Sequence, residues 1–372
     1  MKNILIVFGT RPEIIKLAPV ILEFKKHQKD FKITVCNTEQ QKDLSIQTLK
    51  FFDIIPDISL DVMEFNQGLI GLQTKIMNHL NILGQKNSFD AVIVQGDTMS
   101  AFCGALFGFL NTIPVFHIEA GLRSYNLREP FPEEGLRQMI SRIAALNFAP
   151  TKIDALALKK EMVAKKSIIL TGNTVIDALF CLPKRELQKA EKYFVDKKIV
   201  INDKLVLITV HRRENHGERL DDIIKAIKIL SQDFSDHSFI IPTHPNPNVR
   251  GKITKELSAI KNIFLEEPLS YPNLVFLIAE AKLIITDSGG IQEEAPTFGC
   301  PVLVVRNKTE RTDGIKMKIA KLVGTKTQII VREANKILGL KKKESRIKIA
   351  QNPYGDGKAS KKILIGIQDF FK

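Results

Sequence analysis

The sequence is poor in the features that would place it among disulfide-stabilised, metal-binding or membrane-spanning proteins. Its 372 residues include only four cysteines, far apart and without C-x-x-C spacing, which indicates free thiols in a reducing, cytoplasmic compartment. Neither H-E-x-x-H nor D-x-D occurs, so we expect no metal centre. The first apolar run, ILIVF, ends at Gly9 and is too short for a signal peptide or a membrane span.

The sequence also lacks repeats, low-complexity segments and any nucleic-acid-binding motif. The chain is basic, with 55 Lys and Arg against 41 Asp and Glu and a formal net charge of +14, and such an excess is compatible with anionic ligands or nucleic acid. The lysines are spread along the chain, however, and the one dense run, LKKKESRIK, has no interleaved aromatic residues. We therefore interpret the charge as a lysine-rich surface, with a nucleic-acid-binding protein as the alternative from a different class.

Short apolar, β-branched runs alternate with longer stretches of helical periodicity along the whole chain. Continuous apolar strands separated by helices are typical of parallel sheets covered on both faces. Because the chain is too long for one compact core, we predict an α/β protein with two doubly wound, Rossmann-like domains. The expected strands are NILIVF, KITVCN, DAVIVQG and IPVFHIE in the first series and KLVLITV, SFIIPT, NIFLE, KLIITD and PVLVV in the second.

A lysine- and glutamate-rich stretch, residues 182–204, separates the two series. We place the N-terminal domain at residues 1–172 and the second domain at residues 173–358. In doubly wound folds ligands bind beyond the carboxyl ends of the strands. The residues directly after each strand are therefore the candidates for a functional site.

Two helix starts have the composition of phosphate-binding sites. GTRPEIIK follows the first strand and brings Arg11 and Lys16 close to a helix N-terminus. A helix start flanked by two cations is a candidate anion site, and a plain turn with surface charges is the alternative. In IITDSGGIQEE a strand leads into Ser288–Gly290, and a helix begins with Glu294 in its first turns. Glycines allow the backbone to approach a phosphate, and an acid about one turn later can accept from ribose hydroxyls.

Carboxylates gather after two strands of the first series. Asp97 ends the strand AVIV, where it either caps the next helix or takes part in chemistry. Alternation puts His117 and Glu119 on one side of the next strand. Glu133 and Glu134 start the helix after the irregular segment HIEAGLRSYNLREPFPEE. Such a cluster favours proton transfer.

Basic residues occupy the corresponding positions in the second series. ITVHRREN sets His211 and Arg212 at a strand end, KTER brings Arg311 after a later strand, and PTHPNPN holds His244 in a proline-rich loop. An acidic half and a basic half, each with a phosphate-binding helix start, indicate an enzyme of nucleotide-diphosphate-sugar chemistry.

Nine motifs, in this order, resemble those of the non-hydrolysing UDP-N-acetylglucosamine 2-epimerases. They span nearly the whole chain and read FGTRPEIIK, GDT, EAGLR, PFPEE, HRREN, DSGGIQEEAP, TER, KLVGT and NPYGDG. The resemblance implies the glycosyltransferase-B fold with its active site in the inter-domain cleft, a homodimer, and a last helix, residues 359–372, packed back on the N-terminal domain. It also implies interconversion of UDP-GlcNAc and UDP-ManNAc without a metal or nicotinamide cofactor, as a source of ManNAc for cell-surface polysaccharide.

The resemblance assigns roles to individual residues as well. In this family UDP is eliminated to give a 2-acetamidoglucal and is then added back, which needs carboxylates to move protons and cations to stabilise the leaving UDP. The implied catalytic residues are Asp97, Glu119, Glu133 and His211. The implied substrate-binding residues are Arg11, Lys16, Asp97, Glu119, His211, Ser288, Gly289, Gly290, Glu294 and Arg311.

In some bacterial relatives a second, regulatory UDP-GlcNAc site exists. Its residues would correspond to Gln40, Asp43, Glu134, Arg212 and His244. Here Gln41 stands where the usual histidine would be, Asp43 adds a carboxylate, and EFNQG lacks an arginine, so we expect a weakened regulatory site.

Two other enzymes of the same fold stay open as alternatives: a 2-epimerase of a related UDP-N-acetylamino sugar, and a UDP-sugar-dependent glycosyltransferase, which would need only one base.

Overall fold

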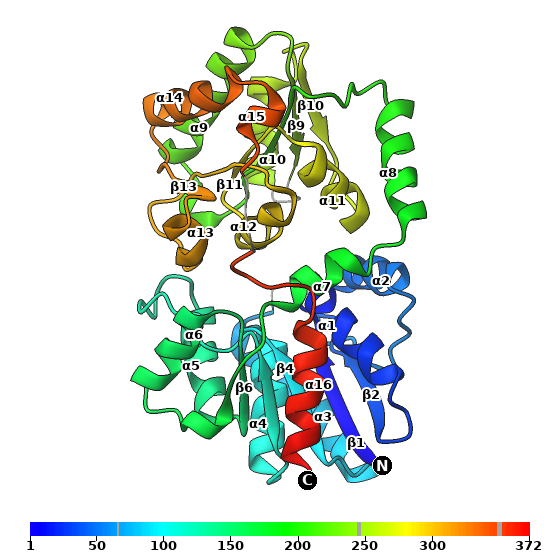
Figure 1. Ribbon diagram of the computed structural model, residues 1–372. Coiled ribbons are helices and arrows are strands. Elements are labelled where there is room, and N and C mark those ends of the chain that lie inside the picture. Colours follow the sequence, from blue (N-terminus) through cyan, green and yellow to red (C-terminus); the bar gives the residue numbers. More distant parts are fainter. Residues whose placement is uncertain (65–66, 244–246, 348–351) are drawn as a thin grey trace. The chain divides into compact units, whose positions relative to one another are not determined.

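The computed structural model describes residues 1–64, 67–243, 247–347 and 352–372, which form two compact units. Unit 1 comprises Met1–Cys181 and Pro353–Lys372, and unit 2 comprises Leu182–Asn352. Each unit contains a parallel sheet with helices on both faces (Figure 1). The predicted class, an α/β protein with two Rossmann-like domains, is confirmed.

The sheet of unit 1 has, within the described residues, seven parallel strands in the order β3-β2-β1-β4-β5-β6-β7. The strand order reverses at β1, which pairs with β2 on one side and β4 on the other. The elements of unit 1 are β1 (Lys2–Phe8), α1 (Arg11–Lys25), β2 (Phe31–Asn37), α2 (Lys42–Phe51), β3 (Ile58–Ser59), α3 (Leu69–Lys86), β4 (Ala91–Gln95), α4 (Met99–Leu110), β5 (Val115–Ile118), α5 (Glu133–Ile143), β6 (Leu146–Ala149), α6 (Lys152–Lys160), η1 (Lys165–Ser167), β7 (Ile168–Leu170), α7 (Thr174–Phe180) and α16 (Ala359–Phe370).

The continuous apolar run of β1 is buried because helices cover both faces of the sheet. Alternate residues Leu5 and Val7 pack with α3, α4 and α5 on one face. Helices α1, α7 and α16 contact one another on the other face (Figure 1). A strand buried on both sides has no polar positions, which explains why ILIVF is apolar without alternation.

Helix α16 returns to unit 1 and is anchored at both ends. The buried carboxylate of Asp177 accepts the N–H groups of Ala359 at 3.1 Å and Ser360 at 2.8 Å, so a residue of α7 satisfies the first turn of α16. At the other end the rings of Phe116 and Phe370 meet edge to face, with centroids 5.1 Å apart. The last helix of the chain therefore belongs to the core of unit 1.

The boundaries of the two compact units differ from the boundaries of 172/173 and 358/359 that we predict from sequence. Unit 1 extends to Cys181 and resumes at Pro353. The physical reason is that α7 packs on α1 and α16, while the N–H group of Asn173 donates to the carbonyl of Tyr354 at 2.6 Å. Residues 173–181 and 353–358 are thereby tied to the first sheet.

The sheet of unit 2, in the part of residues 182–352 that the structure describes, has six parallel strands in the order β10-β9-β8-β11-β12-β13. Val206 and Ile208 of β8 pack with α9 and α14, and Leu205 and Leu207 pack with α8 and α11. The elements are α8 (Lys184–Asp196), β8 (Leu205–Thr209), η2 (Arg213–Asn215), α9 (Glu218–Asp233), β9 (Ser238–Pro242), α10 (Pro247–Leu257), β10 (Ile263–Glu266), α11 (Tyr271–Glu280), β11 (Leu283–Thr286), α12 (Gly289–Glu294), η3 (Ala295–Phe298), β12 (Val302–Val304), α13 (Thr312–Lys316), β13 (Ala320–Leu322), α14 (Thr327–Leu338) and α15 (Lys342–Ser345).

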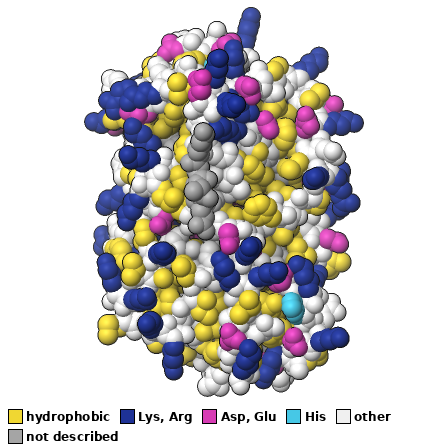
Figure 2. Space-filling view, viewed as in Figure 1, with side chains coloured by type: hydrophobic (Ala, Val, Ile, Leu, Met, Phe, Trp, Pro, Cys, Tyr) yellow, Lys and Arg dark blue, Asp and Glu magenta, His cyan; other side chains and the backbone are white. Residues whose placement is uncertain are grey.

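The surface carries the basic excess as scattered side chains. Figure 2 shows Lys and Arg spread over the visible face between apolar and uncharged areas, with no single continuous basic band. No helix in the described ranges is long and apolar enough to cross a membrane. The cysteines are free thiols, and burial raises the pKa of Cys36, Cys103 and Cys300 to about 12, which makes these three unreactive at neutral pH.

Candidate functional site

Polar residues from separate strand-to-helix segments meet around the carboxylate of Glu119 in unit 1. Glu119 directly follows β5, with its backbone in the left-handed region at φ +64°, and its side chain is buried. Lys16 of α1 and Gln95 of β4 contact its two carboxylate oxygens, and Asn173, after β7, donates to Oε1 at 3.2 Å. Because parallel strands end at one edge of the sheet, the predicted site residues Lys16 and Glu119 are in direct contact.

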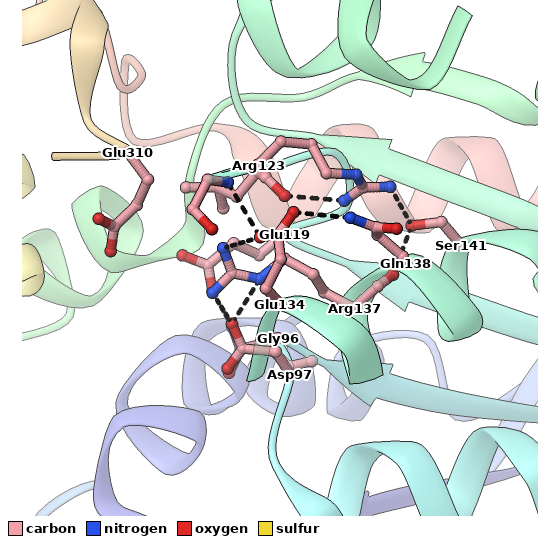
Figure 3. A network of polar contacts seen from close by, with 12 residues as sticks. Gly96, Asp97, Glu119, Arg123, Glu134, Arg137, Gln138, Ser141 and Glu310 are labelled. Carbon is pink, nitrogen blue, oxygen red and sulfur yellow. Dashed lines mark hydrogen bonds and ion pairs between the residues drawn. The ribbon is translucent and has the colours of Figure 1, made fainter. Parts of the chain in front are cut away.

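Asp97, which follows β4, faces Arg137 of α5. Arg137 is buried, its Nε lies 2.9 Å from Oδ2 of Asp97, and its Nη2 contacts the same oxygen (Figure 3). The helix that begins after Asp97 is capped by Thr98, whose hydroxyl oxygen accepts from the N–H of Ala101 at 3.0 Å. The alternative that Asp97 caps this helix is therefore wrong.

The two adjacent acids at the start of α5 have opposite surroundings. Glu134 is fully buried, and its oxygens accept from the backbone N–H groups of Ser124 and Tyr125 at 2.9 and 3.1 Å and from Gln138 at 2.8 Å. Glu133 keeps a buried oxygen, Oε2, without a hydrogen-bond partner in the described structure. Buried polar atoms almost always have partners, so Glu133 is suited to a ligand or a transferred proton. Glu134 anchors the preceding loop, and its part in a regulatory site stays a prediction.

The turn between β1 and α1 is closed by its own side chains. A Cβ atom at Gly9 would lie 2.0 Å from a hydroxyl oxygen of the loop after β2, so glycine is required. The buried carboxylate of Glu13, whose pKa burial raises to about 7, accepts the N–H groups of Gly9 and Thr10 at 3.1 and 2.8 Å. The N–H of Arg11 donates to the side chain of Gln41 at 3.1 Å. Because these N–H groups are occupied, a phosphate here would have to be held by side chains.

The residues predicted for a regulatory site are placed only in part. The Oε1 atom of Gln40 accepts from the hydroxyl of Ser100 at 2.8 Å, which ties the loop after β2 to α4. The side chain of Asp43 and the whole of His244 lie outside the described residues. In unit 2 the guanidinium of Arg212 lies 3.8 Å from Glu310. The regulatory site stays a prediction.

Asp287 organises the carboxyl edge of the unit 2 sheet. It follows β11, is fully buried, and accepts from the backbone N–H groups of His211 and Arg212 at 3.0 and 2.9 Å. The side chain of Asn215 donates to the same carboxylate at 2.9 Å. Nδ1 of His211 lies 3.2 Å from Oδ1 of Asp287; burial lowers the pKa of His211, and the charge of Asp287 opposes that shift. Asp287 thus fixes the turn that presents His211.

Glu310 of unit 2 lies among arginines. It is 3.1 Å from Nη1 of Arg306 and 3.8 Å from Nη2 of Arg212, and it also contacts Arg311. Nε of Arg311 donates to Glu293 at 3.0 Å. Burial on its own would raise the pKa of Glu310, but the three guanidinium groups outweigh burial and lower it. Arg311, predicted to bind phosphate, is therefore held in place by acids of its own unit.

The Ser288–Gly290 segment leads from β11 into α12. A Cβ atom at Gly289 would lie 2.8 Å from Cζ of Arg311, so this glycine lets the guanidinium rest against the helix start. A Cβ at Gly290 would meet nothing within 4 Å, and the side chain of Ser288 does not cap α12. Glu294 is buried and accepts from a tyrosine hydroxyl of α11 at 3.0 Å. The segment therefore keeps open space beside Gly290 and brings Arg311 next to it.

His117 supports the turn that carries Asp97. It lies in β5, is fully buried, and its Nε2 is 2.8 Å from the carbonyl oxygen of Gly96. Burial lowers the pKa of His117 to about 4. The ring is therefore neutral at neutral pH, and Nε2 donates its hydrogen to the carbonyl. His117 is therefore a structural donor that supports the turn at Gly96.

This buried histidine should make the protein less stable in acid. The unfolded chain takes up a proton at the ordinary pKa of 6.5, whereas the folded chain does so only near 4. The contribution of His117 to the free energy of unfolding is therefore fully present above about pH 6.5. It falls by about 3 kcal/mol as the pH drops from there to the pKa of the folded state. Urea unfolding of wild type and His117→Gln across this range measures it. The variant keeps a hydrogen-bond donor but cannot take up a proton, so its free energy of unfolding should fall less as the pH drops. An equal fall in both proteins would show that His117 does not cause the loss of stability in acid.

Several residues that complete the site are absent from the sequence-based prediction. Gln95 and Asn173 both stand at strand ends, so the rule that identified Asp97 would also have found them. Arg137 lies on the same face of α5 as Glu133 and Glu134, at helical spacing. Its pairing with Asp97 has no local signal. The described residues contain no group of three or more His, Cys, Asp and Glu side chains arranged to hold a metal ion.

The chain matches known proteins over almost its full length. A family model described as UDP-N-acetylglucosamine 2-epimerase matches residues 23–368. The UDP-N-acetylglucosamine 2-epimerase of Campylobacter jejuni is 43% identical over 376 residues, which cover 98% of this chain and 97% of that protein. A crystal structure of UDP-GlcNAc 2-epimerase from Neisseria meningitidis bound to UDP-GlcNAc has a TM-score of 0.91 and 42% identity, with 99% and 100% of the two chains covered. The enzyme from Methanocaldococcus jannaschii, solved in complex with UDP-GlcNAc and UDP, has a TM-score of 0.85 and 31% identity over 99% and 100%. With its carboxylates at the carboxyl edge of the unit 1 sheet and its His211 turn at the carboxyl edge of the unit 2 sheet, the chain belongs to the UDP-N-acetylglucosamine 2-epimerase family of isomerases.

Proposed function

We propose that the protein interconverts UDP-GlcNAc and UDP-ManNAc by inverting C2 of the sugar, without a cofactor. The observation that carries the proposal is the set of carboxylates Asp97, Glu119 and Glu133 at strand and helix ends of unit 1, in a chain of this family. The Neisseria meningitidis and Methanocaldococcus jannaschii proteins, both described as bound to UDP-GlcNAc, support the choice of substrate. We propose that the enzyme is a cytoplasmic homodimer. Its product would supply ManNAc for cell-surface polysaccharide.

The proposed reaction proceeds by elimination and re-addition. The proton on C2 is not α to a carbonyl, so its removal becomes feasible only if a leaving group departs. A carboxylate takes the C2 proton as the C1–O bond to UDP breaks, which gives UDP and a 2-acetamidoglucal with a C1–C2 double bond. UDP then adds back to C1, and a proton is delivered to the other face of C2. Asp97, Glu119 and Glu133 form the acid–base set, and the individual transfers are not divided among them.

Unit 2 would hold the UDP moiety during this sequence. Arg311 and His211 are positioned by buried carboxylates, so their orientation is established before the ligand arrives, and preorganised donors stabilise charge on a leaving diphosphate. The open space beside Gly290 supports close approach of a phosphate to the backbone. Ser288 and Glu294 complete the proposed nucleotide-binding set, while Arg11 and Lys16 would contribute cations from unit 1.

The decisive experiment is proton NMR of the protein with UDP-GlcNAc in D2O. We expect UDP-ManNAc to appear with deuterium at C2, because the abstracted proton exchanges with solvent before re-addition, and slow release of UDP and 2-acetamidoglucal on long incubation. Retention of the original C2 hydrogen in every product molecule would exclude elimination. No reaction until an acceptor sugar is added would favour the glycosyltransferase, and turnover of only another UDP-N-acetylamino sugar would change the substrate.

A further inference from the structure

Arg137 connects Asp97 to the loop before α5. Its side chain is 6% exposed, and its donors are divided between two acids (Figure 3). Nε and Nη2 both point to Oδ2 of Asp97, at 2.9 Å for Nε, while Nη1 lies 3.3 Å from Oε2 of Glu134. A single buried cation therefore bridges Asp97 and Glu134.

We propose that Arg137 is a positioning residue that immobilises Oδ2 of Asp97 and leaves Oδ1 as the oxygen that exchanges a proton with the sugar. Both contacts between the guanidinium and Asp97 go to Oδ2, and the described residues provide no hydrogen-bond donor to Oδ1. The side chain of Asp97 is 27% exposed, so a ligand can reach it. This inference rests on the proposed function, because it gives Asp97 a part in proton transfer.

Glu134 holds Arg137 in turn. Its carboxylate is fully buried and receives the backbone N–H groups of Ser124 and Tyr125 as well as the side chain of Gln138. The order of contacts runs from the loop at 124–125 through Glu134 and Arg137 to Asp97. A forked, planar guanidinium can serve both carboxylates at once, whereas a lysine offers a single point charge. The position of Oδ1 therefore depends on the Arg137 fork and on the loop behind it.

Arg137→Ala tests the inference through a split between kcat and KM. We expect kcat to fall by about 10²-fold because a misoriented acid–base group loses its alignment. KM should change by less than about threefold, because on this inference Arg137 acts through Asp97 and not on the ligand itself. Millimolar guanidinium should restore about tenfold of the lost rate by refilling the charged fork. Equal concentrations of urea, which has the same shape without charge, and of sodium chloride should not. Arg137→Lys should be intermediate.

Arg123 provides the matched control. It is also buried and binds a carboxylate in a bidentate manner, Glu161 at 2.7 and 2.8 Å, but it touches neither Asp97 nor Glu134. Arg123→Ala should lose thermal stability and show no recovery of kcat with guanidinium. If Arg137→Ala is too unstable to assay, Glu134→Gln, which leaves the Asp97 contact but loosens Arg137, should lower kcat with KM retained.

The outcomes separate this inference from the proposed function. A raised KM with unchanged kcat would make Arg137 a ligand-binding residue and overturn the inference. Loss of kcat without guanidinium rescue, matching the loss of folded protein, would reduce Arg137 to a structural role. If the wild type itself does not epimerise UDP-GlcNAc, the proposed function fails first, and the kcat comparison then has no reaction to measure.

Discussion

Replacement of Asp97 with Asn should lower kcat by roughly 10²–10⁴-fold, the range that one positioned acid–base group contributes, while UDP affinity stays close to wild type. Asn has nearly the size of Asp and still accepts a hydrogen bond from Arg137, but it neither takes up nor delivers a proton. Because Thr98, and not Asp97, caps α4, the substitution leaves the helix start intact. Steady-state kinetics with UDP-GlcNAc and calorimetric titration with UDP measure the two quantities.

The exposed Asp369 in α16 offers a control for the Asp97 variant. Asp369→Asn removes one negative charge from a side chain that is 60% exposed, so kinetics and UDP binding should both be unchanged. A rate close to wild type for Asp97→Asn would remove Asp97 from the acid–base set. A parallel loss of UDP affinity would instead mean that the Asp97–Arg137 pair supports the fold of unit 1.

Replacement of Asp287 with Asn should lower the free energy of unfolding of unit 2 by about 3 kcal/mol, the cost of removing one partner from a buried charged network. Three donors converge on this carboxylate: the N–H groups of His211 and Arg212 and the side chain of Asn215. The amide of Asn presents its own N–H groups to some of them, so buried donors lose their acceptor. Urea unfolding followed by circular dichroism measures the loss.

A second readout connects the Asp287 variant to function. Since Asp287 orders the turn that presents His211, the UDP affinity of the folded variant should also fall. Asp196, exposed at the end of α8, supplies the control, and Asp196→Asn should change neither property. Unchanged stability of the Asp287 variant would show that the HRREN turn is held by other contacts.

The order of strands and helices could be predicted because the apolar pattern of a parallel sheet is a local property. A strand buried on both faces must be apolar throughout, and KLVLITV and KLIITD became β8 and β11 for that reason. The nine motifs placed the chain in its family, which the comparisons confirm. The end of unit 1 was not predictable in this way, because it depends on α7 packing against α1 and α16.

The positions of the acids in the candidate site could be predicted from the sequence, but most of the residues that contact them could not. Asp97 and Glu119 stand directly after strands, and the rule that ligands bind beyond strand ends needs no knowledge of contacts. No local pattern showed that the oxygens of Glu134 accept from the backbone of the preceding loop. The helix start after β1 was expected to bind an anion beside Arg11 and Lys16, and only the structure shows that Glu13 accepts the N–H groups of Gly9 and Thr10 in the turn before it.

The sequence by itself determined the fold class, the family and the strand ends at which the acids stand, because apolar periodicity and short motifs are read along the chain. Only the tertiary structure decided which charges meet. Lys16 and Glu119 are 103 positions apart, and Asp97 and Arg137 are 40 apart. They come together because the strand order β1-β4-β5 brings the carboxyl ends of distant strands to one edge. Burial at that edge favours pairing of opposite charges, and this pairing sets which carboxylate oxygens are held by other side chains.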